Sequence, residues 1–236
     1  MTTATLERPK LRPRHGKPAL LPLRNGDHLS RVEFERRWEV TPGLKRAELI
    51  EGIVFMPPPT SDTHGERHGR IHHWLSLYAH ATPGLRLGIA PSVRLDNKNE
   101  FQPDCVLRVE ASQLGRLRVA VDDILEGAPE LVTEVAVSSA DYEAHEKREV
   151  YERAGIQEYL LWQVLDGRCD WLTLEEGQFV PLPPRADGVS CSQVFPGLWL
   201  DLPALVAGDE RRVATVLTRG LNSAEHAAFV KKLAGK

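Results

Sequence analysis

Two acidic residues occupy positions where a carboxylate could hold a metal ion. Glu134 lies within LVTEVAV, residues 131–137, a nearly continuous apolar run that predicts a strand buried on both faces. Asp104, in FQPDCVLRV, follows Pro103 where a turn enters a second strand. Because a buried carboxylate loses its hydration, Glu134 needs a compensating partner. The candidates are a metal ion or a cation such as Lys147, and a purely structural salt bridge is the alternative.

A third carboxylate, Glu48, could complete an oxygen-rich pocket. Carboxylates at adjacent strands suit Mg²⁺ or Mn²⁺, which take carboxylate and water ligands. A lysine beside such a site can orient or deprotonate a water molecule. Lys147 fits this role because only a short loop separates its helix from the Glu134 strand. Tyr151, one helical turn later, shares the face of Lys147 and could hydrogen-bond it or a phosphate, or serve ordinary packing.

Three histidines offer a rival metal site. The sequence THGERHGRIH places them four residues apart, at His64, His68 and His72. Two histidines one helical turn apart can bind Zn²⁺. All three cannot bind one ion, because the first and last are about 12 Å apart at a rise of about 1.5 Å per residue. A pair stays open, although the sequence indicates no third ligand, and His64 could instead contact a phosphate.

The hydrophobic patterns predict the elements that must hold these side chains. In chain order they indicate a helix that begins at Ser30 and ends before Pro42-Gly43, two short strands or one bulged strand over 46–56, a helix over 62–81, strands on both sides of the turn at 96–100, an irregular, partly helical connection over 111–128, a strand over 131–137, a helix over 141–154, a strand over 158–165, two or three short strands, and helices over 203–236. We therefore expect a single-domain α/β fold with one mixed central β-sheet flanked by helices and the Glu134 strand at its centre.

Composition restricts the class of protein. The chain has 236 residues, of which 42% are hydrophobic and 27% charged, so it is not a disordered chain. No apolar run approaches the roughly 18 residues of a membrane span. The three cysteines, Cys105, Cys169 and Cys191, have no CxxC spacing and suggest neither a disulfide framework nor a cysteine zinc site. A reducing, cytoplasmic location is the expectation.

The charged residues are unevenly distributed. Residues 1–24 hold six basic residues and one acid, a net charge of +5, so the rest of the chain carries −8 of the total of −3. Four prolines exclude a regular helix from this segment. We expect residues 1–28 to be a disordered basic arm, either simply solvated or able to contact phosphates. The domain is then expected over residues 29–205, followed by a C-terminal helical extension over residues 206–236.

Five segments, taken together and in order, resemble one family. They are RAELIEGIVFMPPPTSDTH, QPDCVL, PELVTEVAVSS, EKREVYERAGIQEYLLWQV and FPGLWLDL, which lie between about residue 30 and about residue 205. They resemble the Uma2 family (DUF820), and this resemblance implies the restriction-endonuclease-like fold of the PD-(D/E)XK nuclease superfamily. In the wider superfamily a lysine follows the strand glutamate by two residues, where this chain has Ala136. Uma2-like sequences usually carry it on the next helix, where Lys147 lies.

The resemblance implies a Mg²⁺- or Mn²⁺-dependent endonuclease that hydrolyses DNA phosphodiester bonds. Asp104 and Glu134 would hold the metal, Lys147 would orient the water or stabilise developing charge, and Glu48 would bind a second metal or position a metal-bound water. Three further candidates would contact substrate or support the site: His64, Gln102 and Tyr151. Proteins of this kind often form homodimers, and the apolar strands DWLTL and FPGLWL are expected to be exposed at such an interface.

Two other functions stay open. A nuclease-fold protein can become a catalytically inactive DNA-binding or assembly module, and the acidic body of this chain, which repels DNA, favours that alternative. Paired carboxylates could also serve glycoside hydrolysis. The low aromatic content of 6% offers little for a sugar-stacking cleft.

Overall fold

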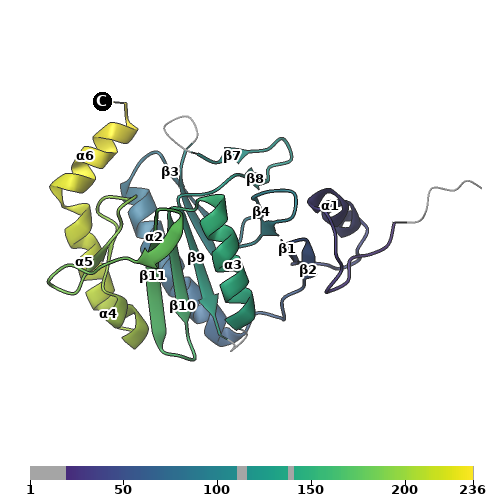
Figure 1. Cartoon of the computed structure of the whole chain (residues 1–236). Coiled ribbons are helices and arrows are strands. Elements are labelled where there is room, and N and C mark those ends of the chain that lie inside the picture. The colour runs from purple at the N-terminus through teal and green to yellow at the C-terminus, as the bar shows by residue number, and fades with distance from the viewer. Residues whose placement is uncertain (1–19, 111–115, 138–140, 236) are drawn as a thin grey trace, which may run out of the picture.

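The computed structural model describes residues 20–110, 116–137 and 141–235, and Figure 1 shows their arrangement. In chain order the helices and strands are α1 (Arg31–Glu39), β1 (Glu48–Ile50), β2 (Ile53–Phe55), α2 (Asp62–Ala81), β3 (Leu85–Ile89), β4 (Val93–Arg94), β5 (Glu100–Phe101), β6 (Cys105–Val109), β7 (Arg118–Val119), β8 (Leu125–Glu126), β9 (Leu131–Ala136), α3 (Asp141–Ala154), β10 (Glu158–Gln163), β11 (Arg168–Glu175), β12 (Gln178–Pro181), β13 (Ser190–Cys191), β14 (Trp199–Leu200), α4 (Leu202–Ala207), α5 (Glu210–Leu221) and α6 (Ala224–Leu233).

A mixed sheet with the strand order β12-β11-β10-β9-β6-β3 forms the centre of the fold. Strand β9 pairs in parallel with β10 and antiparallel with β6, so the Glu134 strand is interior, as predicted. Helix α2 lies behind this sheet and α3 in front of it in Figure 1. Leu131 and Val135 pack with the core on the α2 side, whereas Val132 packs with Tyr151 of α3. Because side chains alternate along a strand, Glu134 faces α3.

A second sheet, with the order β2-β1-β5-β4-β8-β7, accompanies the predicted central sheet. Strands β1 and β2 form a hairpin, which confirms two short strands over 46–56; at its turn Glu51 and Gly52 both have positive φ. Strand β1 also pairs with β5, Leu49 opposite Glu100. This pairing carries Glu48 toward the central sheet. In the described part of the 111–128 connection, β7 and β8 stand where a partly helical segment was expected.

The C-terminal helices α4, α5 and α6 cover the other end of the molecule (Figure 1). Leu205, Leu217 and Leu233 are buried in the main core cluster, and Trp74 of α2 donates a hydrogen bond to the Trp199 carbonyl, 3.1 Å away. The helical prediction for residues 203–236 is confirmed over the described residues.

The two strands expected at an exposed dimer interface are instead buried in this chain's own core, which corrects that expectation. The buried residues are Trp171, Leu172, Leu198, Trp199 and Leu200. Strand β11 lies inside the sheet, between β10 and β12, and β14 packs against α5. The apolar side chains of both segments therefore stabilise the fold of this chain.

Residues 1–19 of the expected basic arm lie outside the described residues. The part that is described packs against the domain: Leu23 is buried in a cluster with Phe34, Leu49 and Val54, and Gly26 N donates to the Val54 carbonyl at 2.8 Å. The expectation of a disordered arm is therefore wrong for the described residues before Ser30. None of the helices in the described segments is long and apolar enough to cross a membrane.

Candidate active site

The cavity that brings candidate residues together lies beside the end of β9. It has a volume of about 300 Å³, and its wall includes the segment Pro57–Pro59, Arg46, His64, Asp104, Glu134, Lys147 and Tyr159. Strand β9 supplies Glu134, α3 supplies Lys147, and α2 supplies His64. Ser61 caps α2 by accepting a hydrogen bond from His64 N at 3.2 Å, which fixes the start of this helix beside the cavity.

Glu134 has two close partners from α3. Lys147 Nζ lies 3.3 Å from Glu134 Oε1, and the Tyr151 hydroxyl donates to the same oxygen at 2.9 Å. The carboxylate is nearly buried, and burial raises its pKa to about 7 although Lys147 acts in the opposite direction. Tyr151 is therefore engaged with Glu134, a more specific role than packing.

Glu48 is a second carboxylate partner of Lys147. Its Oε2 is 2.8 Å from Lys147 Nζ, and its Oε1 accepts a hydrogen bond from Gln102 N at 2.9 Å. Glu48 is fully buried and is not part of the cavity wall. The Gln102 side chain bonds Ser92 Oγ at 3.1 Å, so Gln102 supports the site through its backbone.

Asp104 connects β9 to α2. Its Oδ2 accepts a hydrogen bond from Val135 N at 2.8 Å and lies 3.2 Å from His64 Nε2. Burial is the largest influence and would raise the pKa of Asp104, but the hydrogen bond and charge of His64, the hydrogen bond from Val135 N and the charge of His68 together hold this pKa below its ordinary value. The same bond raises the pKa of His64. Asp104 is thus held as a carboxylate at the cavity wall.

Two imidazole side chains lie next to Asp104 and form a group of three possible metal ligands with it. One ligand atom from each of His64, His68 and Asp104 lies within 4.8 Å of the other two. His68 Nε2 also lies 3.3 Å from Cys105 Sγ. Asp104 is therefore a candidate for the third ligand that the sequence did not indicate for the histidine pair. His72 is not part of this group.

Two cavity residues were missed by the sequence analysis. Arg46 lies two residues before Glu48, and its Nη2 donates to the Gln102 carbonyl at 2.8 Å and lies 3.6 Å from Glu48 Oε1. Tyr159 of β10 is buried, and its hydroxyl has no hydrogen-bond partner among the described residues. Arg46 could have been found from its position, because it is a basic residue close to the ELIEG segment. Nothing in the sequence distinguishes Tyr159 from a core tyrosine.

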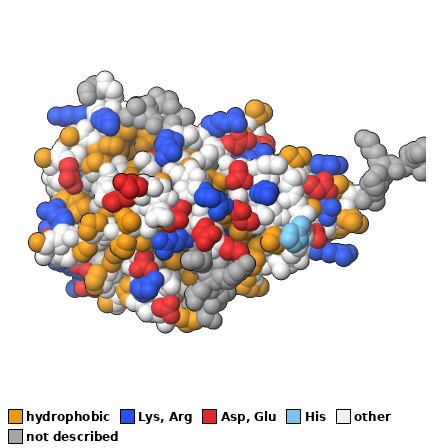
Figure 2. All heavy atoms as spheres, in the orientation of Figure 1, with side chains coloured by type: hydrophobic (Ala, Val, Ile, Leu, Met, Phe, Trp, Pro, Cys, Tyr) orange, Lys and Arg blue, Asp and Glu red, His pale blue; other side chains and the backbone are white. Residues whose placement is uncertain are grey.

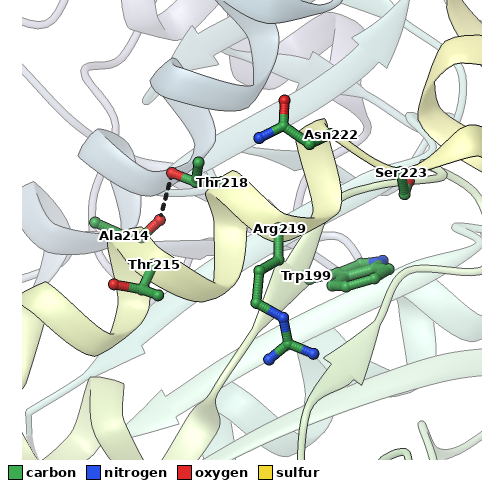
Figure 3. A pocket seen from close by; sticks show the side chains of 7 residues that line it. All are labelled: Trp199, Ala214, Thr215, Thr218, Arg219, Asn222 and Ser223. Atoms are coloured by element: carbon green, nitrogen blue, oxygen red, sulfur yellow. Dashed lines mark hydrogen bonds between the residues drawn. The ribbon is translucent and has the colours of Figure 1, made fainter.

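Another cavity, of about 690 Å³, lies at the C-terminal end and is drawn in Figure 3. Its wall holds Trp199, Arg219 and several small polar residues of α5, such as Thr218, which donates to the Ala214 carbonyl at 2.8 Å. Arg219 is paired with Asp187 at 2.8 Å. None of the predicted site residues lines this cavity, and no carboxylate does, so it lacks the groups of a metal-dependent active site.

Comparison with known proteins gives a matching family and several similar solved structures. The family model Uma2, described as "Putative restriction endonuclease", matches residues 32–203. One of these structures is that of a "putative nuclease belonging to DUF820" from Anabaena variabilis ATCC 29413; it is 14% identical, the match covers 68% of this chain and 90% of that chain, and the TM-score is 0.48. No curated protein matches this chain.

Proposed function

This chain belongs to the Uma2 family, whose description is "Putative restriction endonuclease", and from that premise we propose that it is a metal-dependent endonuclease hydrolysing DNA phosphodiester bonds. The observation that carries the proposal is the convergence of Asp104, Glu134 and Lys147 on one cavity. Two carboxylates and one ammonium in a shared cavity are the groups that metal-assisted phosphate chemistry requires.

The donor set fits a divalent cation. Asp104 and Glu134 offer carboxylate oxygens, which Mg²⁺ and Mn²⁺ prefer. Lys147 is shared between Glu134 and Glu48, and burial still raises the pKa of Glu134 to about 7, so its ionised form lacks full compensation. A cation held by Asp104 and Glu134 would favour that ionised form. When bound, Mg²⁺ or Mn²⁺ would polarise the scissile phosphate and lower the pKa of a water ligand.

The remaining residues divide into contact and positioning roles. Lys147 lines the cavity and can stabilise the negative charge that develops on the phosphate. Glu48 does not reach the cavity wall, so we assign it to holding Lys147 rather than to binding a second metal or positioning a metal-bound water, the two roles that the resemblance implies. Tyr151 orients Glu134 through its 2.9 Å hydrogen bond. Arg46, on the cavity wall, is suited to a substrate phosphate.

The distribution of charge on the surface bears on how the protein would bind DNA. Figure 2 shows Lys and Arg side chains interspersed with Asp and Glu on the face over α3, without a broad stripe of one sign. The charge on such a face gives DNA little long-range attraction. We therefore propose that binding depends on the divalent ion and on the basic residues of the N-terminal arm. A homodimer and a cytoplasmic location complete the proposal, and light scattering on the purified protein tests the dimer.

Plasmid cleavage tests the proposed activity. The wild-type protein should nick or cut DNA in the presence of Mg²⁺ or Mn²⁺, and excess EDTA should abolish this cleavage. Asp104→Asn, Glu134→Gln and Lys147→Met should each lower the rate by about 100-fold or more, whereas Asp166→Asn, at an exposed turn, should not. Cleavage that persists in EDTA, or in all three variants, would contradict the proposal.

DNA binding measured with Ca²⁺ separates the alternative function. A protein that binds DNA tightly in Ca²⁺ but never cleaves it in Mg²⁺ or Mn²⁺ is the inactive binding module instead. Binding and cleavage that are lost together in Asp104→Asn support one metal-dependent site.

A further inference from the structure

Two histidines of α2 place nitrogen ligands beside a site whose proposed metal ligands are all carboxylates. His64 and His68 are one helical turn apart, and their rings meet edge to face with centroids 5.9 Å apart. Helical i, i+4 histidines are a recurrent way to present two imidazoles to one ion. Here both rings face the strand end that carries Asp104, since His64 Nε2 lies 3.2 Å from Asp104 Oδ2 and His68 Nε2 lies 3.3 Å from Cys105 Sγ.

The spacing of the three donors is close to that around a bound ion. Ligand atoms about 2.0–2.2 Å from Zn²⁺ lie at most about 4.4 Å from one another. The donors of His64, His68 and Asp104 already lie within 4.8 Å of one another. A side-chain shift of under about 1 Å therefore suffices to meet one ion. His64 Nδ1 is buried and has no hydrogen-bond partner among the described residues, so no second hydrogen bond holds this ring against such a shift.

A site with two imidazoles and one carboxylate prefers a different metal from a site of carboxylates alone. Mg²⁺ takes oxygen ligands almost exclusively, whereas imidazole suits Zn²⁺, Fe²⁺, Co²⁺ and Ni²⁺. We propose that His64, His68 and Asp104 form a second divalent-metal site, selective for a transition metal of the Zn²⁺ class over Mg²⁺. Three protein ligands leave at least one coordination position for water or a phosphate oxygen, as in open zinc sites.

This inference deepens the proposed function and rests on it in one respect, because Asp104 is shared with the proposed Mg²⁺ or Mn²⁺ ligand set. A carboxylate has two oxygens and can bridge two ions. Val135 N and His64 Nε2 both contact Oδ2, and no hydrogen bond within the described residues uses Oδ1. The second ion would then lie on the α2 side of Asp104, with Glu134 on the α3 side.

Cobalt absorption tests the site without relying on activity. Tag-free, full-length protein is stripped with a chelator, dialysed and titrated with Co²⁺, whose visible absorption bands report imidazole coordination, and Zn²⁺ and Mg²⁺ are then added as competitors. We expect one tight equivalent of Co²⁺ that stoichiometric Zn²⁺ displaces and a thousandfold excess of Mg²⁺ does not. His68→Asn should weaken Co²⁺ binding at least about tenfold.

The matched control is His72→Asn, the next histidine on the same helix, which should bind Co²⁺ like the wild type. Circular dichroism checks that both variants fold, and His68→Gln replaces His68→Asn if the latter does not. Absence of Co²⁺ binding, or equal weakening in the His68 and His72 variants, would overturn the inference.

The two proposals fail in different ways. A wild-type protein that cleaves DNA with Mg²⁺ but shows no imidazole-bound Co²⁺ leaves the proposed function standing and removes the second site. One that binds Co²⁺ through His68 but cleaves DNA with no metal contradicts the proposed function and keeps the site.

Discussion

Lys147 Nζ lies 2.8 Å from Glu48 Oε2 and 3.3 Å from Oε1 of the Glu134 carboxylate that lines the cavity. The cation therefore serves two buried carboxylates that come from different sheets. Both carboxylates contact the same ammonium group. Lys147 therefore contributes both to the stability of the fold and to the chemistry of the cavity.

Removal of Lys147 should destabilise the protein in a metal-dependent way. Lys147→Met leaves Glu48 and Glu134 without their shared cation, and breaking a buried pair typically costs about 3–5 kcal/mol. Urea unfolding at pH 8 in EDTA measures this cost. Because Mg²⁺ would restore positive charge beside Glu134, it should stabilise the variant more than the wild type. Lys98→Met, at an exposed turn, is the control, and equal stability of the two variants would contradict the expectation.

The hydroxyl groups of two neighbouring buried tyrosines should differ in their effect on stability. Tyr151 donates to Glu134 at 2.9 Å, so Tyr151→Phe should cost about 1.5–3 kcal/mol, as for hydrogen bonds to charged groups. Tyr159→Phe removes a hydroxyl that has no partner among the described residues and should be neutral or slightly stabilising. The free energies of unfolding of both variants check this, and a larger loss for Tyr159→Phe would refute the assigned contacts.

Stability should fall with rising pH because of Glu100, which lies outside the candidate active site. Burial, and then the neighbouring Glu35 carboxyl, raise the pKa of Glu100 to about 7 from 4.5, against the opposing charges of Arg94 and Arg31. Since the folded-state pKa lies above the unfolded value, this group's contribution is most favourable below pH 4.5 and is lost as pH rises toward 7.

Glu100→Gln should therefore stabilise the protein at pH 8 and have little effect near pH 4.5. Arg94 keeps Glu35 at 2.7 Å, so the substitution does not leave this guanidinium unpaired. Thermal unfolding between pH 4.5 and 8 measures the difference. Glu39→Gln, an exposed acid of α1, should show no such trend, and a pH-independent effect of Glu100→Gln would rule out this explanation.

Arg46 should contribute to DNA binding more than to the chemical step. Its side chain lies on the cavity wall, where a phosphate can accept from the guanidinium. Arg46→Ala should weaken binding in Ca²⁺ and lower the slope of log K against log salt by about 1. Arg86→Ala, at an exposed pair with Glu110 away from the cavity, should leave the slope unchanged. Equal slopes for both variants would exclude a phosphate contact at Arg46.

The basic N-terminal arm should add salt-dependent affinity. A deletion of residues 2–19 removes five basic residues and one acid, and we expect weaker DNA binding with a smaller salt slope. A full-length variant with the same five residues changed to Gln separates charge from length and should behave like the deletion. Unchanged binding in both proteins would show that the arm takes no part.

The long elements could be predicted because local signals specify them. Helix α2 begins at a Ser61 cap and ends before Pro83-Gly84, and β9 is an apolar run. The two short strands over 46–56 were predicted, but the sheet that they join was not, because its strands are only two or three residues long and some of them pair across large sequence separations, as β4 does with β8. Strands of that length have too few side chains to show a period.

Sequence separation also explains why only part of the site could be predicted. The acid in an apolar strand and the lysine on the next helix are close in sequence, and the structure places them 3.3 Å apart. The partner of His64 and His68 was not found, because Asp104 comes from a distant segment. Apolar residues of β11 and β14 were expected at a surface, yet hydrophobicity alone does not tell a core strand from an interface strand.

By itself, the sequence determined that Glu134 needs a positive partner, because a carboxylate in an apolar strand cannot keep its hydration. It also determined the helices on either side of that strand, through caps and periodicity that act over a few residues. Only the tertiary structure decided that Glu48 shares Lys147, and that Asp104 stands between His64 and Val135 N. Those contacts depend on strand register and on packing across the sheet, which join residues far apart in the chain.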